Sequence, residues 1–154
     1  MKYTISGDNL QFVNIEFMPG EMIYSEAGSM VYMSGNVRME TKATGGVLSG
    51  LKRAMAGESF FVTNFYADGG PGLVGFAGNV PGKVMAIDLR GGKQWVLQKT
   101  AFLAAESKVT LDIAFQRKFG AALFGGEGLI LQKVQGEGTV FIAAAGDIIE
   151  YNLL

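Results

Sequence analysis

The chain has 154 residues, of which 49% are hydrophobic and 18% are charged, and its 13 basic and 14 acidic side chains give a formal net charge of −1. It contains no histidine and no cysteine, which excludes thiol nucleophiles, histidine general bases, serine–histidine triads, iron–sulfur sites and the usual zinc sites. A charge balance so near neutrality also lacks the strong field that attracts nucleic acid or an anionic membrane. Length and composition predict one domain over residues 1–154, built around a single core.

Short alternating hydrophobic runs separated by glycine recur from one end of the chain to the other. They predict strands at residues 3–6, 10–17, 21–25, 29–33, 36–41, 59–66, 72–76, 83–89, 94–98, 101–104, 108–115, 128–134, 139–144 and 147–154. Within the second run the alternation changes phase between Phe12 and Val13, which predicts a bulge or bend. Many short strands with frequent glycine turns indicate an antiparallel sandwich or barrel rather than β-α-β units.

Two segments have helical rather than alternating periodicity. Residues 47–55 place Val47, Leu48, Leu51, Ala54 and Met55 on one side of a helix, which predicts an amphipathic helix of about two turns between flanking glycines. A second helical turn is expected around residues 116–124. The sequence therefore predicts one or two short helices packed on a mainly β structure.

Glycine followed by a charged residue precedes several apolar runs, as at Gly20-Glu21, Gly82-Lys83 and Gly146-Asp147. Glycine adopts the positive φ that a tight turn needs, and the charged residue then faces solvent where the strand begins. We interpret this irregular repeat as turn chemistry and not as a set of catalytic glutamates.

Three local matches to nucleotide or acyl-transfer motifs fail on their context. Residues 70–75 spell the dinucleotide fingerprint G-x-G-x-x-G, but the glycine- and proline-containing residues 76–82 cannot begin the helix that the motif requires. Residues 45–52 approach a P-loop, yet Leu51 stands where the lysine is needed. Ser49 and Lys52 spell S-x-x-K without the partner motifs of the acyl-transfer enzymes.

No catalytic, cofactor or metal-binding residue is predicted. The acidic residues are scattered, with no calcium-loop pattern, although two carboxylates that converge in space could still serve glycoside hydrolysis. The basic pairs Lys52-Arg53 and Arg117-Lys118 are the candidate interaction surface, since clustered cations are what a phosphate-bearing partner would contact.

The first residues lack the apolar stretch of a secretory signal, and the longest uncharged run, residues 69–82, contains six glycines and two prolines. Such a run cannot cross a bilayer as a helix. Together with the absence of cysteine, these features predict a cytoplasmic protein without a transmembrane segment.

Several short stretches of the sequence, in the same order along the chain, resemble one family. They are Pro19-Gly20-Glu21, residues 26–33, residues 50–53, residues 57–61, Pro81-Gly82, Phe102-Leu103, residues 123–129, Gly136-Glu137-Gly138 and Gly146. Over nearly the whole chain, this pattern is similar to the family named for altered inheritance of mitochondria, formerly a domain of unknown function. Compared with typical family members, the chain stops early, at an apolar run over residues 148–154.

The resemblance implies an all-β, double-stranded β-helix or sandwich that is similar in architecture to the tryptophan RNA-binding attenuation protein, with homo-oligomerisation and no established catalytic activity. We therefore expect a non-catalytic binding or assembly module that forms homo-oligomers and needs no cofactor. The alternative is a metal-free, cupin-like protein that binds a small molecule or sugar. RNA binding is a third possibility, less favoured because the basic and aromatic equipment of the RNA-binding relative is not evident.

Overall fold

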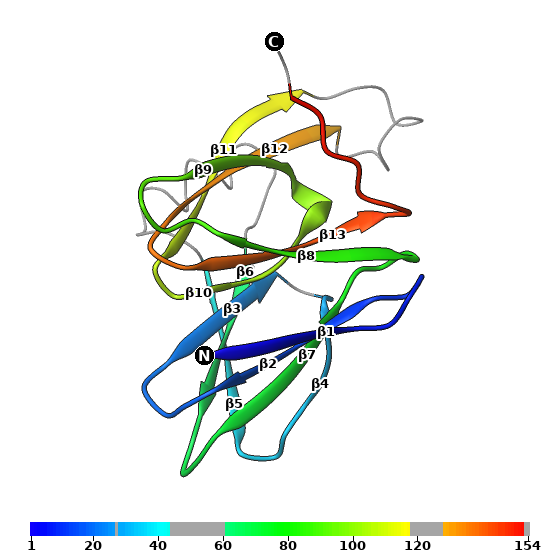
Figure 1. Ribbon diagram of the computed structural model, residues 1–154. Coiled ribbons are helices and arrows are strands. Elements are labelled where there is room, and N and C mark those ends of the chain that lie inside the picture. The colour runs from blue at the N-terminus through cyan, green and yellow to red at the C-terminus, as the bar shows by residue number, and fades with distance from the viewer. Residues whose placement is uncertain (27, 44–60, 118–127, 153–154) are drawn as a thin grey trace.

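The computed structural model describes residues 1–26, 28–43, 61–117 and 128–152. Over these ranges the chain folds into thirteen strands and one turn of 3-10 helix, η1 (Lys99–Ala101) (Figure 1). The strands are β1 (Lys2–Ser6), β2 (Phe12–Phe17), β3 (Met22–Glu26), β4 (Met30–Met33), β5 (Val37–Ala43), β6 (Phe61–Ala67), β7 (Gly72–Ala77), β8 (Gly82–Asp88), β9 (Gln94–Gln98), β10 (Phe102–Glu106), β11 (Val109–Arg117), β12 (Leu129–Gly136) and β13 (Thr139–Ala145).

The strands form three antiparallel sheets. Sheet A has the order β1-β2-β7-β4, sheet B the order β5-β6-β3-β10-β13-β8, and sheet C the order β11-β12-β9. The chain returns repeatedly to sheet B after leaving it for sheet A or sheet C, so most neighbouring strands within a sheet are distant in sequence. Long-range pairing of this kind fixes the fold through tertiary contacts.

Sheet B lies between the other two sheets, and each of its faces is packed. One hydrophobic cluster joins sheets A and B and includes Ile23 and Phe141. A second cluster joins sheets B and C and includes Tyr24 and Val140. Because adjacent strand residues point to opposite faces, Ile23 and its neighbour Tyr24 contribute to different clusters. The single core expected from the sequence is therefore divided by a sheet that is buried on both sides.

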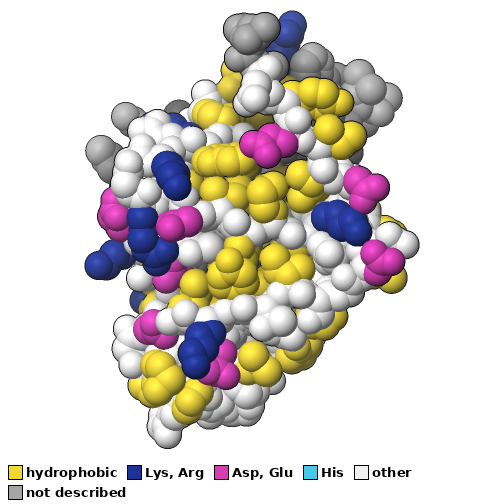
Figure 2. Space-filling model, viewed as in Figure 1, with side chains coloured by type: hydrophobic (Ala, Val, Ile, Leu, Met, Phe, Trp, Pro, Cys, Tyr) yellow, Lys and Arg dark blue, Asp and Glu magenta, His cyan; other side chains and the backbone are white. Residues whose placement is uncertain are grey.

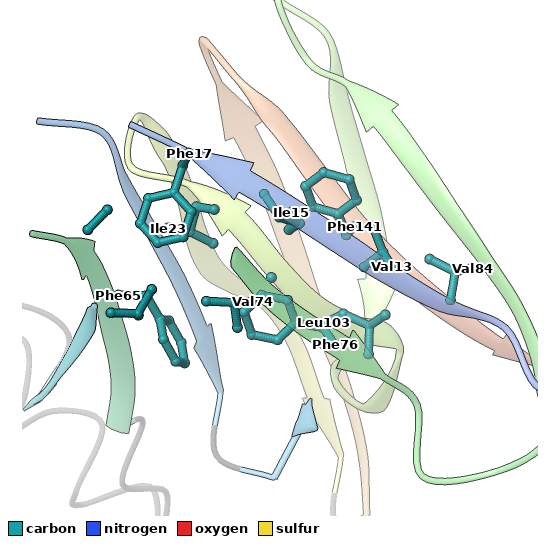
Figure 3. Close-up of a cluster of buried hydrophobic side chains, with 13 residues drawn as sticks. Val13, Ile15, Phe17, Ile23, Phe65, Val74, Phe76, Val84, Leu103 and Phe141 are labelled. Carbon is teal, nitrogen blue, oxygen red and sulfur yellow. The ribbon is translucent and has the colours of Figure 1, made fainter. Parts of the chain in front are cut away.

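The cluster between sheets A and B is built from interleaved aromatic and branched side chains (Figure 3). Phe17 and Ile15 on β2 are fully buried, as are Val74 and Phe76 on β7. Phe65 from sheet B meets Phe76 edge-on, with ring centroids 5.4 Å apart. This contact across the two layers fixes how sheet A sits on sheet B.

The predicted all-β, antiparallel fold is confirmed, but two details of the prediction differ. Residues 147–152 have no regular secondary structure, so the strand expected there is wrong over that part. Of the bulge or bend predicted between Phe12 and Val13, the bulge is wrong: β2 begins at Phe12 and pairs without a register shift with both β1 and β7. The alternation changes phase because Val13, Ile15 and Phe17 form the buried face of β2, whereas Phe12 lies on the other face. Leu10 precedes the strand, in an isolated bridge to Gly82.

The two predicted helices lie wholly or mostly outside the described residues. Residues 47–55 lie outside the described residues. Of the turn expected over 116–124, Gln116 and Arg117 belong to strand β11 and the remainder is not described. Within the described ranges, no helix has the length and apolar character needed to cross a membrane.

Candidate functional site

An apolar groove opens at the edge of sheet A. It has a volume of about 310 Å³ and is lined by residues 10–12, 31–32 and 77–81. These residues come from the β1–β2 connection and the start of β2, from the edge strand β4, and from the end of β7 and the β7–β8 connection. None of these described lining residues is a lysine, arginine, aspartate or glutamate. The groove is suited to apolar contact rather than to acid–base chemistry.

The groove is ringed by apolar side chains that remain in water. Leu10 is 68% exposed, Val31 61% and Val80 58%. Val31 lies where the register of β4 on β7 shifts, between Met30 and Tyr32, and such a bulge on an edge strand redirects a side chain. Clustered exposed apolar groups mark interaction sites more often than scattered ones do.

Tyr32 forms one wall of the groove because β7 has a glycine opposite it. A Cβ atom on Gly75 would lie 2.5 Å from the Tyr32 ring, so only glycine leaves room for the ring to lie against the strand. The Tyr32 hydroxyl donates a hydrogen bond to Oδ1 of Asn14 on β2. Gly75 is the last glycine of the dinucleotide-like motif, and its place inside strand β7 confirms that the motif does not begin a helix.

Three chain segments are joined beneath the groove. The Gln11 backbone N–H donates to the Gly82 carbonyl at 3.0 Å, and the Gly146 N–H donates to the Pro81 carbonyl at 3.1 Å. The Gln11 side-chain oxygen accepts a hydrogen bond from the Val84 N–H at 2.9 Å. A Cβ on Gly82 would lie 1.8 Å from the Ala144 carbonyl oxygen. The floor is therefore a rigid backbone junction that holds the apolar rim in place.

A second, polar cavity of about 520 Å³ lies between the amino terminus and the loops beside β8 and β10. Glu21, Glu106 and Glu137 all line it, so carboxylates do converge in a hollow. The Glu21 carboxylate accepts hydrogen bonds from the Met1 ammonium at 2.6 Å and from the Met18 N–H at 2.7 Å. The hydrogen bond from that ammonium lowers the pKa of Glu21 below its ordinary value of 4.5.

Glu106 is held in the same way. Its Oε2 accepts hydrogen bonds from the Thr139 backbone N–H at 2.5 Å and from Arg90 Nη2 at 2.8 Å. The attraction of Glu106 raises the pKa of Arg90, which also pairs with Asp88 at 3.1 Å. Since these carboxylates satisfy backbone N–H groups and cations, we interpret the polar cavity as a structural junction. No group of three or more Asp, Glu, His or Cys residues suited to a metal occurs within the described ranges.

Of the four predicted interaction residues, the structure describes Arg117 alone, and Arg117 lines neither hollow. Lys52, Arg53 and Lys118 lie outside the described residues, and Arg117 is exposed at the end of β11 in sheet C. Sequence reasoning missed the groove because its residues come from three separate parts of the chain. The only local signal was the phase change between Phe12 and Val13, which we interpreted as a bulge or bend.

Hydrophobic side chains are also visible away from the groove. Figure 2 shows them as a broken band down the middle of one face, with charged side chains mostly along its margins. Trp95 and Val96 on β9, an edge strand of sheet C, are 42% and 56% exposed. In the groove, the exposed apolar side chains surround a hollow.

These features define an all-β sandwich with an apolar edge groove. A family model described as mitochondrial biogenesis AIM24 matches residues 3–154. The chain therefore belongs to the AIM24 family, and the family expected from the sequence blocks is confirmed.

Two streptococcal proteins are similar to this chain. An uncharacterized protein of Streptococcus pyogenes serotype M6, M6_Spy0233, is 38% identical over 158 residues, which cover 96% of this chain and 62% of that protein. The crystal structure of SPYM3_0169 from Streptococcus pyogenes is 32% identical with a TM-score of 0.72, over 95% of this chain and 65% of the other. The chain thus spans just under two thirds of the length of these relatives.

Proposed function

We propose that this protein is a non-catalytic assembly module that binds further copies of itself through the apolar groove. One observation carries the proposal: Leu10, Val31 and Val80, all more than half exposed, surround a single hollow beside the edge strand β4. Covering these side chains removes apolar surface from water, at about 25 cal/mol per Å². An edge strand also presents unpaired backbone groups to a second chain.

The chemistry of the two hollows supports a role without catalysis. The groove is lined by apolar and amide side chains and by one tyrosine. In the polar cavity, Glu21 and Glu106 act as acceptors for backbone N–H groups and cations. A general acid or base needs a pKa near the working pH, whereas the pKa of Glu21 is lowered from 4.5. We also propose a cytoplasmic location, which the cysteine-free sequence favours. The double-stranded β-helix architecture implied by the family resemblance is likewise part of this proposal.

The test is the molar mass in solution, measured by light scattering over a wide range of protein concentration. We expect the unaltered chain to be an oligomer and Val31→Asp to weaken association at least about 100-fold, because an unpaired carboxylate would be buried. Val96→Asp is the matched control: it alters the same residue type at 56% rather than 61% exposure, on the edge of another sheet. A chain that stays monomeric at every concentration, or equal effects of the two variants, would refute the proposal.

Binding of a small molecule or sugar is the alternative, favoured by the groove volume of about 310 Å³, which is near the lower end of the range for ligand pockets. Tyr32 offers an aromatic wall, and Gln11 and Asn79 offer amides. A panel of saccharides and small aromatic compounds should then raise the Tm of the unaltered chain. A ligand that does so without stabilising Val80→Asp would favour this alternative over self-assembly.

A further inference from the structure

The segment after β13 has the composition of a strand but none of its pairing. Residues 147–152 have no regular secondary structure, although they contain Ile148, Ile149 and Tyr151, residue types that favour strands. Ile149 is 70% exposed and Tyr151 is 76% exposed, whereas Ile148 is 39% exposed. In an extended chain alternate side chains share a side. When this segment is extended, Ile149 and Tyr151 share one side and Ile148 lies on the other.

The first residues of this segment are held at the rim of the groove by hydrogen bonding and charge. The Gly146 N–H donates to the carbonyl of Pro81, which lines the groove, and the Asp147 carboxylate lies 3.8 Å from Lys83 Nζ. Gly146 has a φ of +74°, so the chain turns sharply at the point where the segment leaves the sheet. Beyond that turn the segment runs from the end of β13 toward sheet C, away from β4 (Figure 1). None of residues 147–152 lines the groove of its own molecule.

We propose that the 147–152 segment of one copy inserts Ile149 and Tyr151 into the apolar groove of a second copy. The segment of the second copy binds the groove of the first in the same way. This inference rests on the proposed self-assembly and names the segment that fills the groove. Reciprocal exchange of one segment is an economical route to a symmetric dimer, because each copy supplies both the groove and the segment.

The size and chemistry of the two surfaces agree. A cavity of about 150 Å³ holds one benzene ring, so a groove of about 310 Å³ has room for the ring of Tyr151 and the branched side chain of Ile149. Asn79 lines the groove and offers the polar partner that a buried tyrosine hydroxyl requires. The bulge at Val31 and the four-residue length of β4 limit added backbone pairing, so side-chain burial is the main contribution.

The first experiment measures molar mass by light scattering on variants of the 154-residue chain. Ile149→Asp/Tyr151→Asp should shift the assembly to single chains, as Val31→Asp does, while Ile148→Asp, on the other side of the segment, should leave the mass unchanged. If Val31→Asp dissociates the assembly but Ile149→Asp/Tyr151→Asp does not, the groove contacts another part of the second copy and this inference is wrong, although self-assembly stands. Equal dissociation by Ile148→Asp also overturns it. A wild-type chain that is monomeric throughout refutes the proposed function itself.

The second experiment locates the contact by cysteine cross-linking. The chain has no cysteine of its own, so the introduced thiols are the only ones that can react. Val31→Cys protein is mixed with isotopically heavy Ile149→Cys protein, and a short bismaleimide links neighbouring thiols. We expect a mixed light–heavy dimer in severalfold excess over the yield with Ile148→Cys. The absence of that excess would overturn the proposal. In the double variant Val31→Cys/Ile149→Cys, linkage within one chain that persists on dilution would place the segment in its own groove and would overturn exchange between copies.

Discussion

The Glu106 carboxylate stabilises a buried backbone N–H, and replacing it should be costly for that reason rather than for its charge. Its Oε2 accepts hydrogen bonds from the Thr139 N–H and from Arg90. Thr139 is 7% exposed, so little solvent can reach its N–H in place of the carboxylate. The Arg90 side chain is 49% exposed against 21% for Glu106. The two bonds to one oxygen atom therefore differ in how much solvent can replace them.

The expected magnitudes follow from this difference. A buried N–H left without an acceptor costs about 1–3 kcal/mol, whereas an exposed ion pair contributes about 0–1 kcal/mol. Glu106→Ala removes both interactions and should lower the free energy of unfolding by about 2–3 kcal/mol. Glu106→Gln keeps an acceptor for Thr139 and should cost about 1 kcal/mol. Arg90→Ala should cost less than about 1 kcal/mol.

The assay is urea denaturation at one fixed protein concentration, so that any contribution from association is the same for all variants. The three variants should rank with Glu106→Ala as the most destabilised and Arg90→Ala as the least. Arg90→Ala matching Glu106→Ala would show that the ion pair carries the stability and that the reasoning from the buried N–H is wrong.

Three further predictions concern the groove wall and two titrating groups. Gly75→Ala should displace the Tyr32 ring and lower the free energy of unfolding by about 1–3 kcal/mol in a thermal or urea melt. In the control Gly70→Ala, the Cβ would enter open space, and the free energy of unfolding should fall by less than about 1 kcal/mol. Equal losses for the two variants would contradict the steric argument. The pKa of Glu21 is lowered from 4.5, so the stability that this group contributes is present above pH 4.5 and is lost as the pH falls below it. In acid titrations followed by circular dichroism, Glu21→Gln should therefore lose less stability than the unaltered chain. An unchanged profile would count against the pairing with Met1. Burial raises the pKa of Tyr24 above its ordinary value of 10.0, so the stability that Tyr24 contributes is present below pH 10 and is lost as the pH rises further. Tyr24→Phe removes the 2.7 Å hydrogen bond to the Val109 carbonyl. This variant should lower the free energy of unfolding by about 1 kcal/mol at neutral pH and should lose less stability at alkaline pH than the unaltered chain.

Much of the fold could be predicted because strand patterning is local. The alternation of Val109, Leu111 and Ile113 indicates a strand without knowledge of its partner, and β11 begins at Val109. The expectation for residues 147–154 failed over the described part because β-propensity depends on packing against a neighbouring strand. Ile149 and Tyr151 have no such neighbour among the described strands. The same limit applies to Leu10, which the sequence placed in a strand with β2 but which forms a bridge to the distant Gly82.

The sequence by itself determined the class of the protein. Its glycine-punctuated alternation established an all-β fold, its lack of histidine and cysteine excluded whole classes of chemistry, and its ordered blocks indicated the family. Tertiary structure decided how the strands are shared among three sheets and which residues surround the groove. Leu10, Val31 and Val80 are brought together only by pairings between distant strands, and no local pattern encodes such pairings. The glycine at position 75 illustrates the division: the sequence shows that a glycine is there, but only the ring of Tyr32 packed against it shows why.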